Sequence, residues 1–464
     1  MRTSRLLLAA VIAAAACTDA TSPKDVAPPA ASLDSITTPH ASASLLAPAS
    51  LFTSYSPQSS HWPHITTMMT DFYYSWTSTE RAWAGTHYDY AMSGSTSAWL
   101  AVNPTVGHLP YALLWTTITT GTPGIASIYY ADMKHWFAMH TQYPLERAFV
   151  HRKGAPMDSA GRVSYNHWGS NRWAINPADP GAIAYTVNRA QRLAASQRGV
   201  FFDEASTGDM GAHLGAMNEF PSISSYAAAI AKLLRAAKAG VGTKMLMLNT
   251  AEYTSSADSL DAVSAGAVLL EMFNNFRYSG MGSRWQWIEK LASVGVFVDV
   301  VSTYSSQDLP TMTSYPKGNS ATNVQRAKLW ELASYYLAVL ASPKLVALQL
   351  ENEWSKPYSS LWTKAQEANV GHPTAPRVVK LRGTDPLGNN YLVYTRDFDR
   401  ALIVLRLQQG WGAQSYTDGT AINVPLPAGE RWIPLNADGT VGTAVTSIRL
   451  RNSEAAILLK GSKM

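Results

Sequence analysis

Carboxylate residues follow two apolar runs of the sequence, and they have the types and spacing that acid–base chemistry requires. Asp203 and Glu204 come directly after Val200, Phe201 and Phe202, and Glu271 follows the apolar residues 267–270. Cleavage of a glycosidic bond needs two carboxyl groups, one ionised as nucleophile or base and one protonated as general acid. The sequence therefore predicts Asp203 and Glu271 as a catalytic pair.

Only one of the adjacent residues Asp203 and Glu204 can face such a site, because successive residues of a strand point to opposite sides. We expect Asp203 to face it and Glu204 to support it, to contact substrate or to cap the next helix. Both positions also have a structural interpretation. The Asp203–Glu204 pair can cap the following segment, and Glu271 can form an ion pair with Arg277.

Strand-like and helical patterns alternate through the central part of the chain and must position these carboxylates. The expected strands are residues 87–93, 111–117, 147–151, 199–203, 244–249, 267–273, 295–302 and 345–352. The expected helices are residues 131–141, 181–196, 225–238, 255–263, 283–293 and 322–340, with Asp179 and Pro180 opening the second. Residues 65–84 predict a loop and a helix before the first strand.

Eight strands alternating with helices predict an α/β fold, a (β/α)8 TIM barrel over residues 51–372. The carboxyl ends of the strands form the site in such a barrel, which places Asp203 on strand four and Glu271 on strand six. Alternate strands of such a barrel can direct their side chains into the same opening at its carboxyl end. A doubly wound open sheet is the alternative, but the glycine-rich phosphate turn of its nucleotide-binding forms is missing.

The pattern changes near Pro373. Short β-rich runs follow, separated by Gly, Asp and Asn turns and without a long helical pattern, which predicts a small antiparallel β-sandwich over residues 373–464. The runs are residues 378–381, 391–395, 401–405, 421–424 and 455–459. We expect this domain to cover and stabilise the barrel, and binding of carbohydrate is a second possibility.

The beginning of the chain has the features of an export signal. Arg2 and Arg5 precede an apolar stretch that is too short to span a bilayer, so residues 1–16 predict a signal peptide. Cys17 is the single cysteine and follows three alanines, as in a bacterial lipobox. We expect lipidation of Cys17, a flexible Ala/Ser/Thr/Pro-rich tether over residues 17–50, and an exported lipoprotein anchored in the outer membrane.

Composition excludes some partners and favours others. A formal net charge of +5 without any Lys/Arg run gives no support for nucleic-acid binding. The 15 Trp and 22 Tyr suit stacking on sugar rings, although a Trp-rich core is the alternative explanation. The histidines lack the spacing of zinc ligands, and no Gly-x-Ser-x-Gly turn is present, so we expect neither a metal, nor another cofactor, nor serine hydrolysis.

Further polar and aromatic residues are candidates for substrate contact. His, Asn, Arg and Glu can hydrogen-bond sugar hydroxyls, and Trp can stack on the ring. The predicted contacts are His151, Trp168, Asn171, Arg172, Glu204, Asn249 and Asn274. For His151, a satisfied structural histidine is the alternative.

Three segments resemble a known family in sequence and in order. They are RAFVH at 147–151, NRWAINPADP at 171–180 and GVFFDE at 199–204. The order resembles that of the hypothetical glycosyl-hydrolase-like group numbered fifteen, and the similarity extends to Asn249 and Glu271. This resemblance implies a TIM barrel related to the retaining α-galactosidase-like clan. It gives Asp203 the nucleophile's role and Glu271 that of acid/base.

The main hypothesis is thus an exported, lipid-anchored glycoside hydrolase that cleaves a poly- or oligosaccharide, with retention of configuration. The alternative is a glycan-binding surface lipoprotein on a degenerate barrel, in which the carboxylates only hydrogen-bond hydroxyls. A structural envelope protein is a third possibility.

Overall fold

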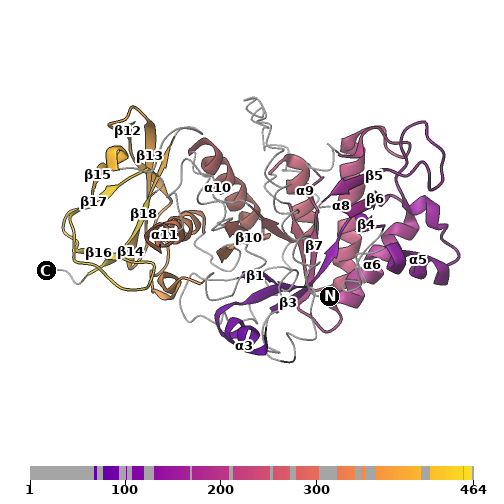
Figure 1. The fold of residues 1–464 in the computed structure, drawn as a ribbon, viewed down its shortest axis with the longest axis horizontal. Coiled ribbons are helices and arrows are strands. Elements are labelled where there is room, and N and C mark those ends of the chain that lie inside the picture. Colours follow the sequence, from indigo (N-terminus) through magenta and orange to yellow (C-terminus); the bar gives the residue numbers. More distant parts are fainter. Residues whose placement is uncertain are drawn as a thin grey trace, which may run out of the picture. The chain divides into compact units, whose positions relative to one another are not determined.

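The computed structural model describes residues 67–70, 77–93, 101, 107–119, 130–167, 170–207, 213–250, 254–271, 278–302, 321–339, 346–350, 362–408, 418–452 and 454–461. Within these residues the chain forms a mixed α/β fold with one large parallel sheet, followed by antiparallel sheets in the C-terminal part (Figure 1). Both of these predicted features are confirmed.

Eight strands form the parallel sheet, and every neighbouring pair in it is parallel. Their order across the sheet is β1 (Thr67–Thr70), β2 (Tyr90–Ser93), β3 (Gly107–Leu113), β7 (Gly199–Asp203), β8 (Met245–Asn249), β9 (Ala267–Leu270), β10 (Phe297–Ser302) and β11 (Val346–Leu350). The sheet curls, because β1 and β11 at its two edges lie beside each other.

The curled sheet encloses its own apolar core. Side chains from strands β2, β3 and β7 to β11 meet in one buried cluster, which includes Tyr90, Leu109, Phe201, Met247 and Leu269. Residues that alternate with these along the strands, such as Val200 and Phe202, pack outward against helices. Because both faces are covered, β7, β8 and β9 are apolar up to their last residues, as the sequence predicted for β7.

Helices connect the strands and cover the outer face of the sheet (Figure 1). They are α6 (Pro180–Ala194), α8 (Ile223–Val241), α9 (Ser256–Ala265), α10 (Tyr278–Ser293) and α11 (Ala321–Ala338), while α3 (Ser78–His87) lies between β1 and β2 in the chain. The predicted start of α6 is confirmed, since the Asp179 side chain accepts a hydrogen bond from the Ala182 N–H at 3.0 Å and Pro180 follows it. None of the helices in the described part has the length and hydropathy needed to cross a bilayer.

Two strand predictions in the first half of the predicted barrel were wrong. One strand was missed and one was predicted where none forms, so the number of strands before β7 is unchanged. Residues 67–70 form β1, where a loop and helix were expected. Residues 147–151 form no barrel strand, because 145–148 is the 3-10 helix η4 (Leu145–Ala148) and Phe149 and His151 form isolated antiparallel bridges. β7 therefore remains the fourth strand in chain order within the large sheet.

Residues 116–174 form an insertion between β3 and β7 that includes a small antiparallel sheet of its own. Its elements are β4 (Thr116–Ile118), α5 (Tyr130–Met139), η4, β5 (Ser164–His167) and β6 (Ser170–Ala174), with the strands in the order β4-β6-β5. The apolar run at 147–151 belongs to this insertion, where Phe149 and Val150 are buried. It has the composition of a strand because its side chains from Ala148 to His151 are buried, which explains the wrong prediction.

The C-terminal part contains a five-stranded and a two-stranded antiparallel sheet. The larger has the order β12 (Val378–Thr384), β13 (Asn390–Asp397), β14 (Ala401–Gln408), β18 (Ala455–Lys460) and β16 (Trp432–Leu435), and the smaller pairs β15 (Ile422–Pro425) with β17 (Ser447–Leu450). Short 3-10 helices, η7 (Lys364–Glu367) and η8 (Asp418–Thr420), precede the two sheets. Leu402, Val424, Trp432 and Leu450 share a buried cluster, so the two sheets pack face to face.

The opposite face of the large C-terminal sheet packs on α11. Leu405 and Ile457 of this sheet belong to the same buried cluster as Trp330 and Tyr336 of α11. Arg396 of β13 donates to the carbonyls of Tyr336 and Leu337, each at 3.2 Å, and so satisfies groups at the C-terminal end of the helix. Helices that cover the parallel sheet and the C-terminal strands therefore share one continuous core.

Candidate active site

The register of three neighbouring strands brings the predicted carboxylates to one face of the sheet. Phe202 of β7 pairs with Leu248 of β8, so the next residues, Asp203 and Asn249, lie side by side. Asn249 in turn pairs with Leu269 of β9, and Glu271 follows two positions later. Because side chains alternate with a period of two, all three polar groups leave the sheet on the face that holds the interior core. They lie at its carboxyl end.

Asn249 connects the two carboxylates directly. Its amide nitrogen Nδ2 donates to Asp203 Oδ1 at 2.7 Å and to Glu271 Oε1 at 2.8 Å. Since both bonds end on one nitrogen, the two carboxylate oxygens lie at most 5.5 Å apart, which is the sum of those distances. Asp203 and Asn249 are buried, at 8% and 5% exposure, whereas Glu271 is partly exposed. The structure thus brings together Asp203, Asn249 and Glu271.

Tyr111 is a fourth member of this group, and sequence reasoning missed it. Its hydroxyl donates to Asp203 Oδ2 at 2.8 Å. Tyr111 lies two residues before Leu113, the partner of Asp203 in β3, so both side chains leave the sheet on the same face. The predicted strand began at Tyr111 and ended at residue 117, whereas β3 ends at Leu113, so the expected bounds placed Tyr111 far from the carboxyl end of the strand and concealed its role.

Glu204 points away from this group and has an unusual backbone. It is the one non-glycine residue in the described part of the chain with a positive φ, at 51°. Its carboxylate forms a short ion pair with Arg172 of β6, and both side chains are largely buried. The Glu204 N–H donates to Asp203 Oδ1 at 2.8 Å. Glu204 therefore gives Asp203 a backbone donor, and its ion pair to the inserted sheet holds the left-handed turn that follows.

The other predicted contacts are distributed differently. Asn171 is exposed and precedes Arg172 on β6, so it lies on the opposite face of the small sheet from the residue that pairs with Glu204. Its amide oxygen accepts a hydrogen bond from Asn166 at 3.3 Å. Trp168, Asn274 and Cys17 lie outside the described residues, as does Arg277.

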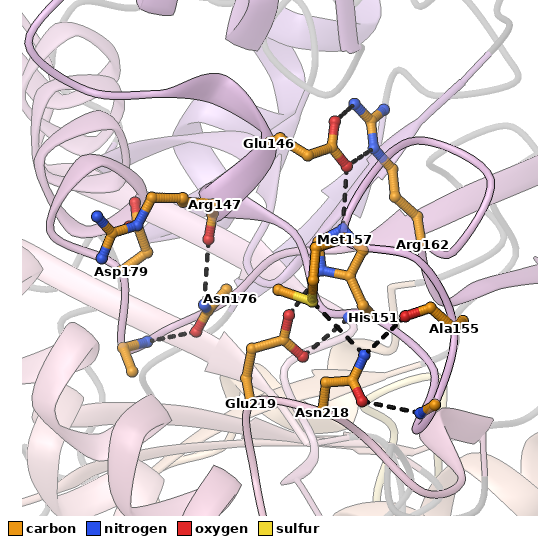
Figure 2. A network of polar contacts seen from close by, with 12 residues as sticks. Glu146, Arg147, His151, Ala155, Met157, Arg162, Asn176, Asp179, Asn218 and Glu219 are labelled. Carbon is orange, nitrogen blue, oxygen red and sulfur yellow. Dashed lines mark hydrogen bonds and ion pairs between the residues drawn. The ribbon is translucent and has the colours of Figure 1, made fainter.

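His151 takes part in a buried polar network within the insertion (Figure 2). Its side chain is fully buried; Nδ1 lies 2.6 Å from Glu219 Oε1, and Nε2 lies 3.0 Å from Glu146 Oε1. The His151 N–H also donates to Glu219 at 2.9 Å. With both ring nitrogens beside carboxylates, this geometry is that of a structural histidine, the alternative interpretation of the residue.

Arg162 completes the network and stabilises its charge. Its guanidinium donates twice to Glu146, at 2.8 and 2.5 Å (Figure 2). The same group lies over the rings of Phe149 and Trp173, at 3.9 and 4.4 Å from their centroids. Burial alone would raise the pKa of the Glu146 carboxyl, but hydrogen bonds from Arg162 and His151 outweigh it and hold that pKa below its usual range. The network ties η4 to the segment before α8.

No protein-family model matches this sequence, and no curated protein is similar to it in sequence. Solved structures of several glycoside hydrolases are similar to it. An α-amylase from Geobacillus thermoleovorans, in complex with acarbose, is 8% identical with a TM-score of 0.46 over 87% of this chain and 100% of that chain. A GH27 β-L-arabinopyranosidase from Geobacillus stearothermophilus is 12% identical, with a TM-score of 0.44 over 86% and 96%.

The glycoside hydrolase domain of PelA from Pseudomonas aeruginosa is 13% identical, with a TM-score of 0.34 over 54% of this chain and 87% of that chain. Identities and TM-scores this low transfer neither residue roles nor an activity.

The chemistry that the site can perform follows from its own groups. Among the described residues, no set of three or more His, Cys, Asp or Glu side chains is placed to hold a metal ion. The site instead offers two carboxyl groups joined by an amide donor, with a phenol and a backbone N–H on one of them. These groups can act on one substrate together. An ionised carboxylate can act on one substrate atom while the other carboxyl group gives a proton to the same atom or to a neighbouring one.

Proposed function

We propose that the chain is a glycoside hydrolase that retains configuration, with Asp203 as nucleophile and Glu271 as acid/base. The observation that carries this proposal is the bridging amide of Asn249, which keeps Oδ1 of Asp203 and Oε1 of Glu271 within 5.5 Å of each other. Two carboxyl groups that share one donor favour the closer spacing of retaining enzymes, about 5 to 5.5 Å, over the roughly 6.5 to 9.5 Å that inverting enzymes need to admit a water.

The hydrogen bonds distinguish the roles of the two groups. Asp203 accepts bonds from Tyr111, Asn249 and the Glu204 N–H, and three donors on one carboxyl group favour its ionised form. An ionised carboxylate can attack the anomeric carbon. Glu271 is partly exposed at the carboxyl end of the sheet, where it can exchange protons with water.

The reaction would proceed in two steps. In the first, an Asp203 oxygen bonds to the anomeric carbon as the glycosidic bond breaks, and Glu271 gives its proton to the departing oxygen. In the second, the Glu271 carboxylate takes a proton from water, whose oxygen displaces Asp203 and releases the sugar. Two inversions at one carbon give net retention.

The eight parallel strands and their adjacent edges support a closed (β/α)8 barrel as the frame for this site. We also propose the division into a signal peptide at 1–16, a tether at 17–50, a catalytic barrel at 51–372 and a C-terminal sandwich at 373–464. Export and lipidation at Cys17 belong to the same proposal. Palmitate labelling that persists in a Cys17→Ser variant would contradict the lipid anchor.

The catalytic proposal can be tested with purified protein and a panel of polysaccharides and aryl glycosides. We expect turnover of at least one substrate, with NMR detecting a product of retained configuration. Asp203→Asn should lower kcat by about 10⁴-fold or more, because it removes the nucleophile. Glu271→Gln should lower it by roughly 10²- to 10⁴-fold, less so for substrates whose leaving groups need no proton.

Azide provides a matched control for these assignments. It should rescue Asp203→Gly by forming a glycosyl azide of inverted configuration, and Glu271→Ala by forming one of retained configuration. A product of inverted configuration from the wild-type enzyme would contradict the retaining mechanism. Binding without turnover by the wild-type protein would identify the alternative, a glycan-binding lipoprotein.

A further inference from the structure

Two buried aspartates on α9 contact the chain immediately after the proposed nucleophile. Asp258 and Asp261 are both fully buried. The Ser206 hydroxyl donates to Asp258 Oδ1 at 2.9 Å, and the Thr207 hydroxyl forms a short bond to Asp261 Oδ2. Ser206 and Thr207 are themselves buried, at 3% and 0% exposure. The segment that leaves β7 is therefore attached to α9 away from water.

Only part of this arrangement serves the helix itself. Asp258 Oδ2 accepts from the N–H and the hydroxyl of Ser255, at 3.0 and 2.5 Å, which completes a capping box at the start of α9. The other oxygen of Asp258 bonds outside the helix, and Asp261 contributes nothing to the cap. Burial of a carboxyl group is costly. Since Asp261 is buried despite this cost and accepts from the Thr207 hydroxyl, we infer that its burial serves to hold the loop in place.

Residues 204–207, which follow β7, form backbone hydrogen bonds to Asp203 and to Asn249. The Glu204 N–H donates to Asp203 Oδ1 at 2.8 Å, and the Ala205 N–H donates to the Asn249 carbonyl at 2.9 Å. Ser206 and Thr207 come next, so their attachment to α9 limits how far those two backbone amides can move. Burial raises the pKa of the Asp261 carboxyl to about 8, and Asp258 adds to this shift while Thr207 opposes it. Asp261 can thus hold the loop as an uncharged group at neutral pH.

We propose that Asp258 and Asp261 are positioning residues, which hold Ser206 and Thr207 and so keep Asp203 aligned with Asn249 and the Glu204 amide. The consequence for catalysis rests on the proposed glycosidase function, whereas the consequence for the geometry of the loop does not. The two can therefore be tested separately, on the full-length protein.

The test compares Asp261→Ala with two matched variants. Asp261→Asn keeps an acceptor for the Thr207 hydroxyl. Ser259→Ala removes a buried hydroxyl of the same helix that accepts from Trp287 Nε1 at 2.8 Å and does not contact the loop. Hydrogen exchange of the peptide 199–207 should be accelerated about tenfold or more in Asp261→Ala, and unchanged in the other two variants.

Kinetics give a second readout. On the substrate identified by the panel, Asp261→Ala should lose about 10²-fold in kcat, the effect of a misplaced catalytic group, with KM within about twofold of wild type. Asp261→Asn should keep its kcat. If Asp261→Ala does not fold, Thr207→Val, which removes only the hydroxyl, takes its place.

Equal exchange of peptide 199–207 in Asp261→Ala and Ser259→Ala would overturn the proposal, as would a loss confined to KM. Failure of the glycosidase function has a different signature, namely no turnover by the wild-type protein while the exchange difference persists.

Discussion

At the scale of single residues, the surroundings of Asp203 are asymmetric. Its Oδ1 accepts from Asn249 and from the Glu204 backbone, and its Oδ2 accepts from Tyr111. The two oxygens thus receive hydrogen bonds from different elements: Oδ1 from β8 and from the backbone that follows β7, and Oδ2 from a phenol of β3. Tyr111 contacts Asp203 from β3, and its hydroxyl can be removed without breaking the link that runs from Asp203 through Asn249 to Glu271.

Tyr111→Phe should therefore change catalysis more than stability. Loss of a hydrogen bond to a charged group costs about 1.5 to 3 kcal/mol, which corresponds to roughly 10- to 150-fold in kcat/KM. We expect the loss mainly in kcat, measured on the substrate that the wild-type enzyme cleaves. An unchanged kcat with a lower melting temperature would instead indicate that Tyr111 only supports the core.

A second prediction at this scale separates backbone strain from charge at Glu204. Glu204→Ala leaves the buried Arg172 without its carboxylate and keeps the positive φ of 51°. We expect it to destabilise the fold by about 3 to 5 kcal/mol. Glu204→Gly loses the same ion pair but adopts the left-handed turn without a Cβ, so it should be about 1 kcal/mol more stable than Glu204→Ala. Urea unfolding measures both, and the reverse order would contradict a strained turn.

At the scale of elements, α9 gives the protein a dependence of stability on pH. The pKa of the Asp261 carboxyl is about 8 in the folded chain and has an ordinary value of 3.8. Between these values the folded state keeps a proton that the unfolded state has released, so the free energy of unfolding falls as pH rises. The slope is at most about 1.4 kcal/mol per pH unit and ends near pH 8.

Asp261→Asn cannot release this proton and should lose that part of the slope. Its melting temperature should therefore exceed that of the wild type by more at pH 8 than at pH 5, as calorimetry can determine. Parallel pH profiles for the two proteins would show that Asp261 is already ionised in the folded state.

The strands include both the clearest success and the clearest failure of prediction from the sequence. Asp203 and Glu271 could be found because an apolar run that ends in a carboxylate marks the end of a buried parallel strand. β1 is four residues long and has no alternation that separates it from a loop. The run at 147–151 has a strand's composition because it is buried inside the insertion.

Partners that depend on tertiary contacts were not predictable. Arg172 and Glu204 are 32 residues apart, and Tyr111 and Asp203 are 92 apart. No periodicity relates such positions, and only the register of the strands and the path of the insertion bring them together. The different surroundings of Asp203 and Glu204 were predicted, in contrast, although the reason given was strand alternation and Glu204 lies just beyond the end of β7.

At the scale of the whole molecule, the C-terminal strands and α11 form one structural unit. Tyr336 of α11 packs on Phe398, with ring centroids 5.6 Å apart, and Arg377 donates to Glu289 of α10 and to the Leu337 carbonyl. We expect residues 51–464 to unfold in a single thermal transition, and a chain that ends at residue 372 to lose its cooperative transition and aggregate. Two separate transitions in calorimetry would contradict this.

A substitution tests the same contact with less disruption. Arg396→Gln would remove the guanidinium bond to the Tyr336 carbonyl and one of the two guanidinium bonds to the Leu337 carbonyl inside a buried interface, at a cost of about 1 to 3 kcal/mol. Arg382→Gln, an exposed arginine of β12, is the control and should be within about 0.5 kcal/mol of wild type.

The contact between α11 and the sheet also restricts how genes for this protein can recombine. A module that folds alone can be fused to new neighbours at either end. The strands after residue 373 do not meet that condition, since one face of their sheet is completed by a helix encoded upstream. Crossovers that exchange these strands between relatives should therefore survive only when the segment encoding α11 is exchanged with them.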